Sequence, residues 1–126
     1  MSNNVVWVID DDPIFRMIVK TISEFANEVW EVSEFPNVQD ANKALKETAA
    51  IPDAILLDVN IPVGGGWVFL EEFENMRSTE DRTKLYICSS SIDVNDKSRA
   101  ASSPAVRSFI EKPLPNDFFS QLESNK

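Results

Sequence analysis

The chain of 126 residues contains no histidine, and its only cysteine is Cys88. The lack of histidine excludes catalytic arrangements of the Ser-His-Asp and Cys-His kinds, acid–base chemistry by imidazole, and most zinc sites. A single cysteine excludes an internal disulfide and a zinc site built from several cysteines. Any chemistry on this chain must therefore use carboxylates, hydroxyls, lysine and backbone groups.

Basic residues are also scarce, since 12 Lys and Arg stand against 21 Asp and Glu and leave a net charge of −9. This balance argues against direct binding of nucleic acid, which needs a basic patch, and favours basic partners or a bound cation. No apolar run approaches the roughly 20 residues that span a bilayer, and the N-terminus lacks the basic region of a signal peptide. We therefore expect a cytoplasmic protein with no membrane insertion.

The sequence does have the composition of a folded domain, with 43% hydrophobic and 26% charged residues. Its length predicts a single domain, residues 1–126. Short apolar runs typical of strands alternate along it with segments of helical character. The expected strands are 5–9, 29–35, 54–57, 84–88 and 106–110, and the expected helices begin at Pro13 and then cover 38–49, 67–77, 93–101 and 115–123.

The first of these helices has a clear start, with Asp12 as its N-cap and Pro13 in its first turn. Apolar residues recur along it at helical spacing, which is typical of the side that faces a core. These residues are Ile14, Met17, Ile18, Ile22 and Phe25.

The alternation predicts an α/β fold, with a mostly parallel sheet and helices on both faces. Right-handed crossovers place the carboxyl ends of all strands at one edge, where ligands bind in open α/β sheets. Polar residues follow four of the strands at this edge, namely Asp10-Asp11-Asp12, Asp58, Ser89 and Lys112. We therefore expect these side chains to lie close together.

Such a group of side chains has a definite chemistry. Clustered carboxylates need a compensating cation, because like charges repel and some of the acids would otherwise take up protons. Mg²⁺ prefers oxygen ligands and is commonly held by carboxylates, phosphate oxygens and water. Asp58 could then attack phosphorus as a nucleophile, while Lys112 and Ser89 bind the transferred phosphoryl group. This chemistry fits a protein that receives phosphate from a donor elsewhere.

Each feature also has a simpler explanation. The acids before Pro13 suit a solvated helix start, Asp58 suits a turn, Ser89 a loop and Lys112 a surface position. All three glycines of the chain, residues 64–66, follow Asp58 closely and permit positive φ in a tight connection. Chance explains the joint position of the polar residues at one edge less easily than it explains any one of them.

Four motifs carry a resemblance to a known family: VIDDDP at 8–13, LLDVNIP at 56–62, CSSS at 88–91 and FIEKP at 109–113. In their order and separation, the chain resembles the receiver domain of two-component response regulators over nearly its full length. The resemblance implies a doubly wound, five-stranded parallel sheet with the flavodoxin-like strand order 2-1-3-4-5 and helices on both faces.

The resemblance also implies roles for the acids. Asp58 matches the aspartate that accepts a phosphoryl group from a histidine kinase or a histidine phosphotransfer protein, in a reaction that depends on Mg²⁺ or possible substitutes such as Mn²⁺. Asp10 and Asp11 match the acid pair that holds the metal, and Asn60 matches the residue whose backbone carbonyl binds it. A pair made of Asp11 and Asp12 is the alternative, but Asp12 is better suited to the helix cap.

The remaining implied roles concern switching. Ser89 and Lys112 match the hydroxyl and the lysine that engage the phosphoryl group, and the bond from Lys112 to Pro113 is commonly cis in the family. Phe109 occupies the aromatic switch position, although an ordinary core residue is an equal alternative there. Gly66 matches the glycine usual in the connection after the acceptor. Phosphorylation would alter the surface formed by the last two helices and the fifth strand.

We therefore expect a stand-alone, monomeric receiver without an output domain, which docks to an unknown partner or relays phosphate. It would be no enzyme beyond its own Mg²⁺-dependent phosphorylation and dephosphorylation. A rival class is the phosphatase of the haloacid dehalogenase type, which needs a second aspartate where this chain has Asn60 and Thr or Val where it has Pro62. A degenerate receiver that acts only by interaction is disfavoured, because every matched position holds a workable residue.

Overall fold

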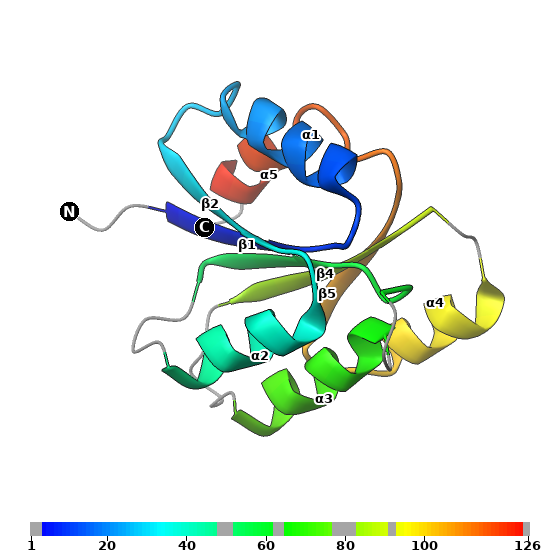
Figure 1. Cartoon of the computed structure of the whole chain (residues 1–126). Coiled ribbons are helices and arrows are strands. Elements are labelled where there is room, and N and C mark those ends of the chain that lie inside the picture. The colour runs from blue at the N-terminus through cyan, green and yellow to red at the C-terminus, as the bar shows by residue number, and fades with distance from the viewer. Residues whose placement is uncertain (1–3, 48–51, 62–64, 77–82, 91–92, 125–126) are drawn as a thin grey trace.

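The computed structural model describes residues 4–47, 52–61, 65–76, 83–90 and 93–124. Strands and helices alternate along the chain as the sequence predicts (Figure 1). The strands are β1 (Asn4–Ile9), β2 (Trp30–Phe35), β3 (Ala54–Leu57), β4 (Lys84–Ser89) and β5 (Val106–Glu111). The helices are α1 (Pro13–Ser23), α2 (Val38–Glu47), α3 (Gly65–Met76), α4 (Val94–Ala101) and α5 (Phe118–Ser124).

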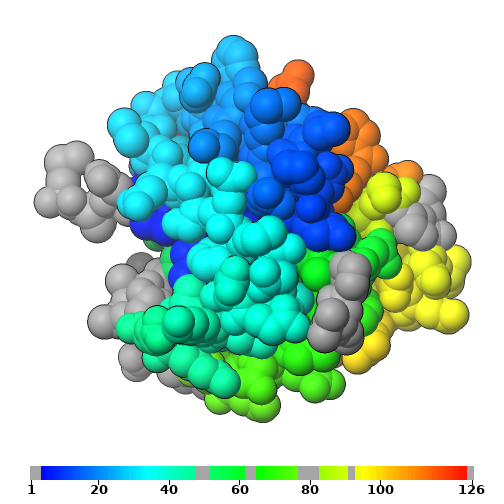
Figure 2. Space-filling model, viewed as in Figure 1, coloured from blue at the N-terminus to red at the C-terminus, as the bar shows by residue number. Residues whose placement is uncertain are grey.

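The strands form one parallel sheet in the order β2-β1-β3-β4-β5, which confirms the predicted fold class. Helices α1 and α5 cover one face of this sheet, and α2 and α3 cover the other (Figure 1). In the space-filling view, the helices and the segments around them hide most of the central strands (Figure 2). Among the described residues, no helix is both long enough and apolar enough to cross a bilayer.

The central strand β3 shows why the sheet is buried on both faces. All four of its residues are apolar and inaccessible, as parallel strands covered by helices require. Ile55 and Leu57 join the core under α2 and α3, whereas Ala54 and Leu56 join the core under α1 and α5. The strand therefore ends in a fixed position, and the residue that follows it, Asp58, is fixed with it.

The start of α1 agrees with the sequence. The Asp12 side chain accepts a hydrogen bond from the Ile14 backbone N–H at 2.9 Å, and Pro13 occupies the first turn. This cap satisfies one of the N–H groups that a helix start leaves without an intrahelical partner.

The apolar face expected for α1 is wrong at three positions. Ile14, Met17 and Phe25 are 61%, 58% and 74% exposed, and Phe25 lies beyond the end of the helix. The buried residues of α1 are Phe15, Val19 and Ile22, and Ile18 is half-buried. Both sets recur at helical spacing, so spacing alone could not choose between them. Which set is buried depends on which side of α1 faces the sheet and α5.

Two further boundaries differ from expectation. Helix α3 begins at Gly65, earlier than the expected residue 67, and α5 begins at Phe118 rather than near residue 115. The earlier start of α3 brings its first glycines against the backbone that follows Asp58, which matters for the site.

Candidate functional site

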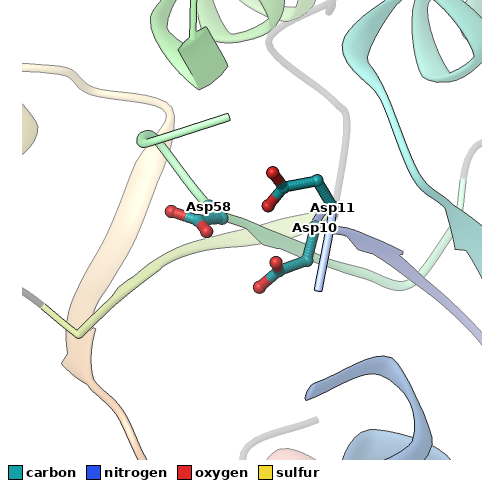
Figure 3. A group of neighbouring side chains, drawn as sticks. All are labelled: Asp10, Asp11 and Asp58. Atoms are coloured by element: carbon teal, nitrogen blue, oxygen red, sulfur yellow. The ribbon is translucent and has the colours of Figure 1, made fainter. Parts of the chain in front are cut away.

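Three acids meet at the carboxyl edge of the sheet. Asp10 follows β1 and Asp58 follows β3, and these strands are neighbours in which Ile9 pairs with Leu57. One carboxylate oxygen from each of Asp10, Asp11 and Asp58 lies within 4.8 Å of the other two (Figure 3). Asp10 and Asp58 are only 1% and 8% exposed, whereas Asp11 is exposed. The cluster is therefore mostly withdrawn from water but open on one side.

Lys112 directly follows β5, and its side chain lies in the same cluster. Its Nζ lies 2.6 Å from Asp10 Oδ2 and 3.4 Å from Asp58 Oδ2. The Lys112–Pro113 peptide bond is cis, as the family resemblance led us to expect. These residues therefore meet although Lys112 lies 102 positions from Asp10 and 54 positions from Asp58 along the chain.

The charges of this cluster are only partly balanced. Burial raises the pKa of the Asp10 carboxyl and the charge of Asp58 adds to this, although Lys112 and the Asp12 N–H act against the rise. Burial tends to lower the pKa of Lys112, but the hydrogen bond to Asp10 and the charge of Asp58 outweigh it, so the net pKa is raised. One ammonium therefore faces two buried carboxylates and an exposed one. Such an excess of oxygen ligands fits a divalent cation such as Mg²⁺.

Asn60 connects the segment after β3 with Ser89. The backbone N–H of Asn60 donates to Asp58 Oδ1 at 2.8 Å, and its side-chain amide donates to Ser89 Oγ at 2.9 Å. Ser89 itself is fully buried at the end of β4. The sequence placed Ser89 at this edge, but it gave Asn60 a role only through its backbone carbonyl. The only signal in the sequence for the side-chain contact with Ser89 was an amide residue two positions after Asp58.

Two glycines let α3 begin directly against this loop. Gly65 has φ of +66°, and a Cβ there would lie 2.6 Å from the Val59 carbonyl oxygen. A Cβ on Gly66 would lie 2.5 Å from the carbonyl oxygen of Asp58. Side chains at both positions would therefore push against the backbone that holds Asp58. Gly64 lies outside the described residues.

Phe109, the expected switch residue, is half-buried on β5 and packs against the core under α2 and α3. Lys97 of α4 places its Nζ 5.9 Å from the centre of this ring. A second contact of this kind joins α4 to α3, because the Arg99 guanidinium lies 4.4 Å from the centre of the Trp67 ring. Sequence reasoning missed both contacts, since the basic and aromatic partners are far apart along the chain.

Arg16 is a further residue that the sequence did not identify. Its Nη1 donates to the backbone carbonyl of Asp10 at 2.7 Å, and its Nε pairs with Glu34 of β2 at 3.1 Å. The guanidinium thus joins the end of β1 to the neighbouring strand and restricts the position of Asp10. A basic residue one turn into the helix after the acids was the signal for it.

With this geometry in view, the comparisons with known proteins identify the family. Residues 6–122 match the family described as the response regulator receiver domain, and the chain belongs to it. A two component response regulator from Cytophaga hutchinsonii superposes with a TM-score of 0.86 at 26% identity, over 99% of this chain and 97% of that one. The Mn²⁺-bound form of response regulator Rcp1 superposes with a TM-score of 0.77 at 18% identity, over 96% of this chain and 90% of that one.

One curated relative is much longer than this chain. It is the protein-glutamate methylesterase/protein-glutamine glutaminase of Agrobacterium fabrum (strain C58 / ATCC 33970), 29% identical over 112 residues. The match covers 89% of this chain but 30% of that protein. The similarity therefore concerns the receiver part, and the activity of the longer protein does not follow from it.

The geometry predicts which acids bind a metal ion. Asp11→Asn should weaken Mg²⁺ binding on the order of tenfold or more, because it removes one carboxylate from the cluster. Asp12→Asn is the matched control, since it removes the same charge next door while asparagine still caps α1. Isothermal titration with MgCl₂ measures both. A loss of affinity in Asp12→Asn as large as that in Asp11→Asn would place the metal on the alternative pair, Asp11 and Asp12.

Proposed function

We propose that this receiver domain accepts a phosphoryl group on Asp58 and changes a protein-binding surface in response. One observation carries the proposal most directly. Lys112, which follows β5, contacts both Asp10 and Asp58, which follow β1 and β3. This arrangement sets an ammonium beside the nucleophile and beside an excess of carboxylates. Membership of the receiver family supports the same chemistry.

The transfer itself can be written with the residues of the site. A carboxylate oxygen of Asp58 forms a bond to phosphorus as the bond to the donor breaks, and the donor leaves with the electron pair of that bond. Lys112 neutralises charge on the transferred oxygens. Asp10, Asp11, Asp58 and the backbone carbonyl of Asn60 would hold Mg²⁺ or Mn²⁺. A bound cation would supply further positive charge for the phosphoryl oxygens, and the Mn²⁺-bound form of Rcp1 supports this choice of metals.

Labelling tests the acceptor. Incubated with Mg²⁺ and acetyl phosphate, the protein should gain one acid-stable, base-labile phosphoryl group, and Asp58→Asn should gain none because the nucleophile is gone. Asp40→Asn, which alters an exposed acid on α2, should label like the wild type. Intact-mass spectrometry measures the added group. Labelling of Asp58→Asn at the wild-type level would refute the acceptor assignment.

The surface beside the acids suits a protein donor. Ile14 and Met17 are exposed on α1 directly after the acid run, where a soluble surface would favour polar residues. Beside α1 lies a cleft of about 600 Å³, whose walls include Phe25 and Pro113, the neighbour of Lys112. A histidine kinase or a histidine phosphotransfer protein must bring its phosphohistidine to Asp58. We propose that it docks on this apolar side of α1.

A charge introduced on α1 should affect phosphoryl transfer from a protein donor but not from a small-molecule donor. Met17→Glu should slow transfer from a phosphorylated histidine phosphotransfer domain by about tenfold, because it buries a charge in the interface. It should leave labelling by acetyl phosphate unchanged. Val29→Glu is the matched control, because Val29 is exposed just before β2 at the opposite edge of the sheet. Equal slowing in both variants would exclude α1 as the docking surface.

Two contacts in the site must change when Asp58 is phosphorylated. Lys112 lies closer to Asp10 than to Asp58, and the Ser89 hydroxyl accepts from the Asn60 amide. Phosphoryl oxygens on Asp58 would draw both groups toward themselves. A shift from about 1% to 99% of the active form would need about 5.5 kcal/mol of differential stabilisation. We propose that the change reaches Phe109 and the α4–β5–α5 surface.

A variant of Ser89 tests the proposed coupling between phosphorylation of Asp58 and the α4–β5–α5 surface. Ser89→Ala should still bind beryllofluoride, a phosphoryl mimic, but the resulting amide shifts in residues 94–111 should be largely lost because nothing replaces the hydroxyl. Ser108→Ala, on the exposed side of β5, is the control and should respond like the wild type. Two-dimensional NMR with and without beryllofluoride measures this. A full response in Ser89→Ala would disprove the coupling.

We propose that the receiver acts in the cytoplasm through docking or phosphorelay, as a monomeric switch and not as an enzyme on other substrates. The polar character of α4 supports docking, because Ala100 is its buried residue and most of its surface faces outward. The acidic net charge favours a partner with basic residues.

A further inference from the structure

The ammonium of Lys112 has a third neighbour besides the two acids. Its Nζ lies 4.2 Å from the centre of the Phe15 ring. The Lys112 side chain is 15% exposed, so water reaches it only in part. An ammonium placed over the face of an aromatic ring is attracted by the quadrupole of that ring, most strongly where water is scarce. Phe15 therefore attracts the Lys112 ammonium in addition to packing in the core.

The fold fixes the position of this ring. Phe15 is 5% exposed and belongs to the core under α1 and α5, on the buried side of α1. The helix that carries it starts at the Asp12 cap, directly after the acids of the site. The ring is thus held by packing on one side and meets Lys112 on another.

We propose that Phe15 is a positioning residue, whose ring holds the Lys112 ammonium beside Asp58 for phosphoryl transfer. The inference rests on the proposed function, since it concerns the same lysine and acceptor. It adds a residue of α1 that neither the motifs nor the acid cluster identify.

The directions of the contacts explain why a ring suits this task. The carboxylates of Asp10 and Asp58 compete for the ammonium, which lies 2.6 Å from one and 3.4 Å from the other. Phosphorylation requires the ammonium to move toward Asp58. A hydrogen-bond acceptor in place of the ring would bind the ammonium at a fixed angle, whereas the face of a ring attracts it over a broad area. Phe15 can therefore keep the ammonium in the site while it changes partners.

Graded fluorination tests this without changing the packing greatly. Mono-, di- and trifluorophenylalanine installed at position 15 progressively weaken the negative face of the ring while its shape stays nearly the same. The initial rate of labelling by Mg²⁺ and acetyl phosphate should fall stepwise, by about two- to tenfold in total. Phe73 is the matched control, because it is fully buried on the other face of the sheet, and no cation–ring contact involves it among the described residues.

The two fluorination series show whether Phe15 has the proposed positioning role. A stepwise fall at position 15 with a flat series at position 73 supports the proposal. A flat series at position 15, or equal falls at both positions, overturns it while the acceptor role of Asp58 stands. If the wild type gains no phosphoryl group on Asp58, the proposed function itself fails, and the positioning role fails with it.

A second measurement does not depend on phosphorylation. In the metal-free protein, the ε-methylene protons of Lys112 should show the upfield NMR shift that a ring face causes, and Phe15→Leu should abolish it. The melting temperature of Phe15→Leu shows whether that variant is folded. If the wild-type ε-protons resonate at the position of an exposed lysine, the ring does not hold the ammonium and the proposal is overturned.

Discussion

Two buried carboxylates share one ammonium at the carboxyl edge of this sheet. The rest of the structure fixes the positions of these three charged groups. Asp10 and Asp58 are nearly inaccessible, so each is costly to keep charged, and Lys112 compensates for one of them. Cores on both faces fix β1 and β3, and β5 delivers the lysine. If these strand ends separated, the carboxylates would no longer form a cluster that favours a bound cation. The proposed chemistry would then be lost.

This excess of carboxylates over ammonium also explains how a small chemical change could alter the surface. Lys112 and Ser89 each have a present partner, Asp10 and Asn60, and each would have a competing partner in a phosphorylated Asp58. Competing contacts of this kind give discrete arrangements and not a continuous deformation. Helix α4 is well placed to follow such a change, because cation–ring contacts join it to Trp67, near the start of α3, and to Phe109.

The sequence predicted the fold class because apolar runs and helical segments alternate without interruption, and parallel connections leave few topologies. The strand order was expected only from the resemblance to receiver domains. The alternation also brought Asp58 and Lys112 to one edge, which the structure shows. It could not give contacts that depend on side-chain direction. The amide of Asn60 on Ser89 and the ring of Phe15 beside Lys112 arise from rotamers and helix rotation, which residue spacing does not encode.

The error in the apolar face of α1 has a physical meaning. A helix that is apolar on more than one side is stable in a monomer only if the excess is tolerated on the surface, and Ile14 and Met17 are exposed there. Core packing offers no reason for these two residues, because Phe15 and Val19 already fill the buried side. Their position directly after the acids does offer one, since the protein donor proposed above would approach Asp58 from that edge. The exposed apolar residues that spacing wrongly assigned to the core are thus consistent with the docking surface proposed for α1.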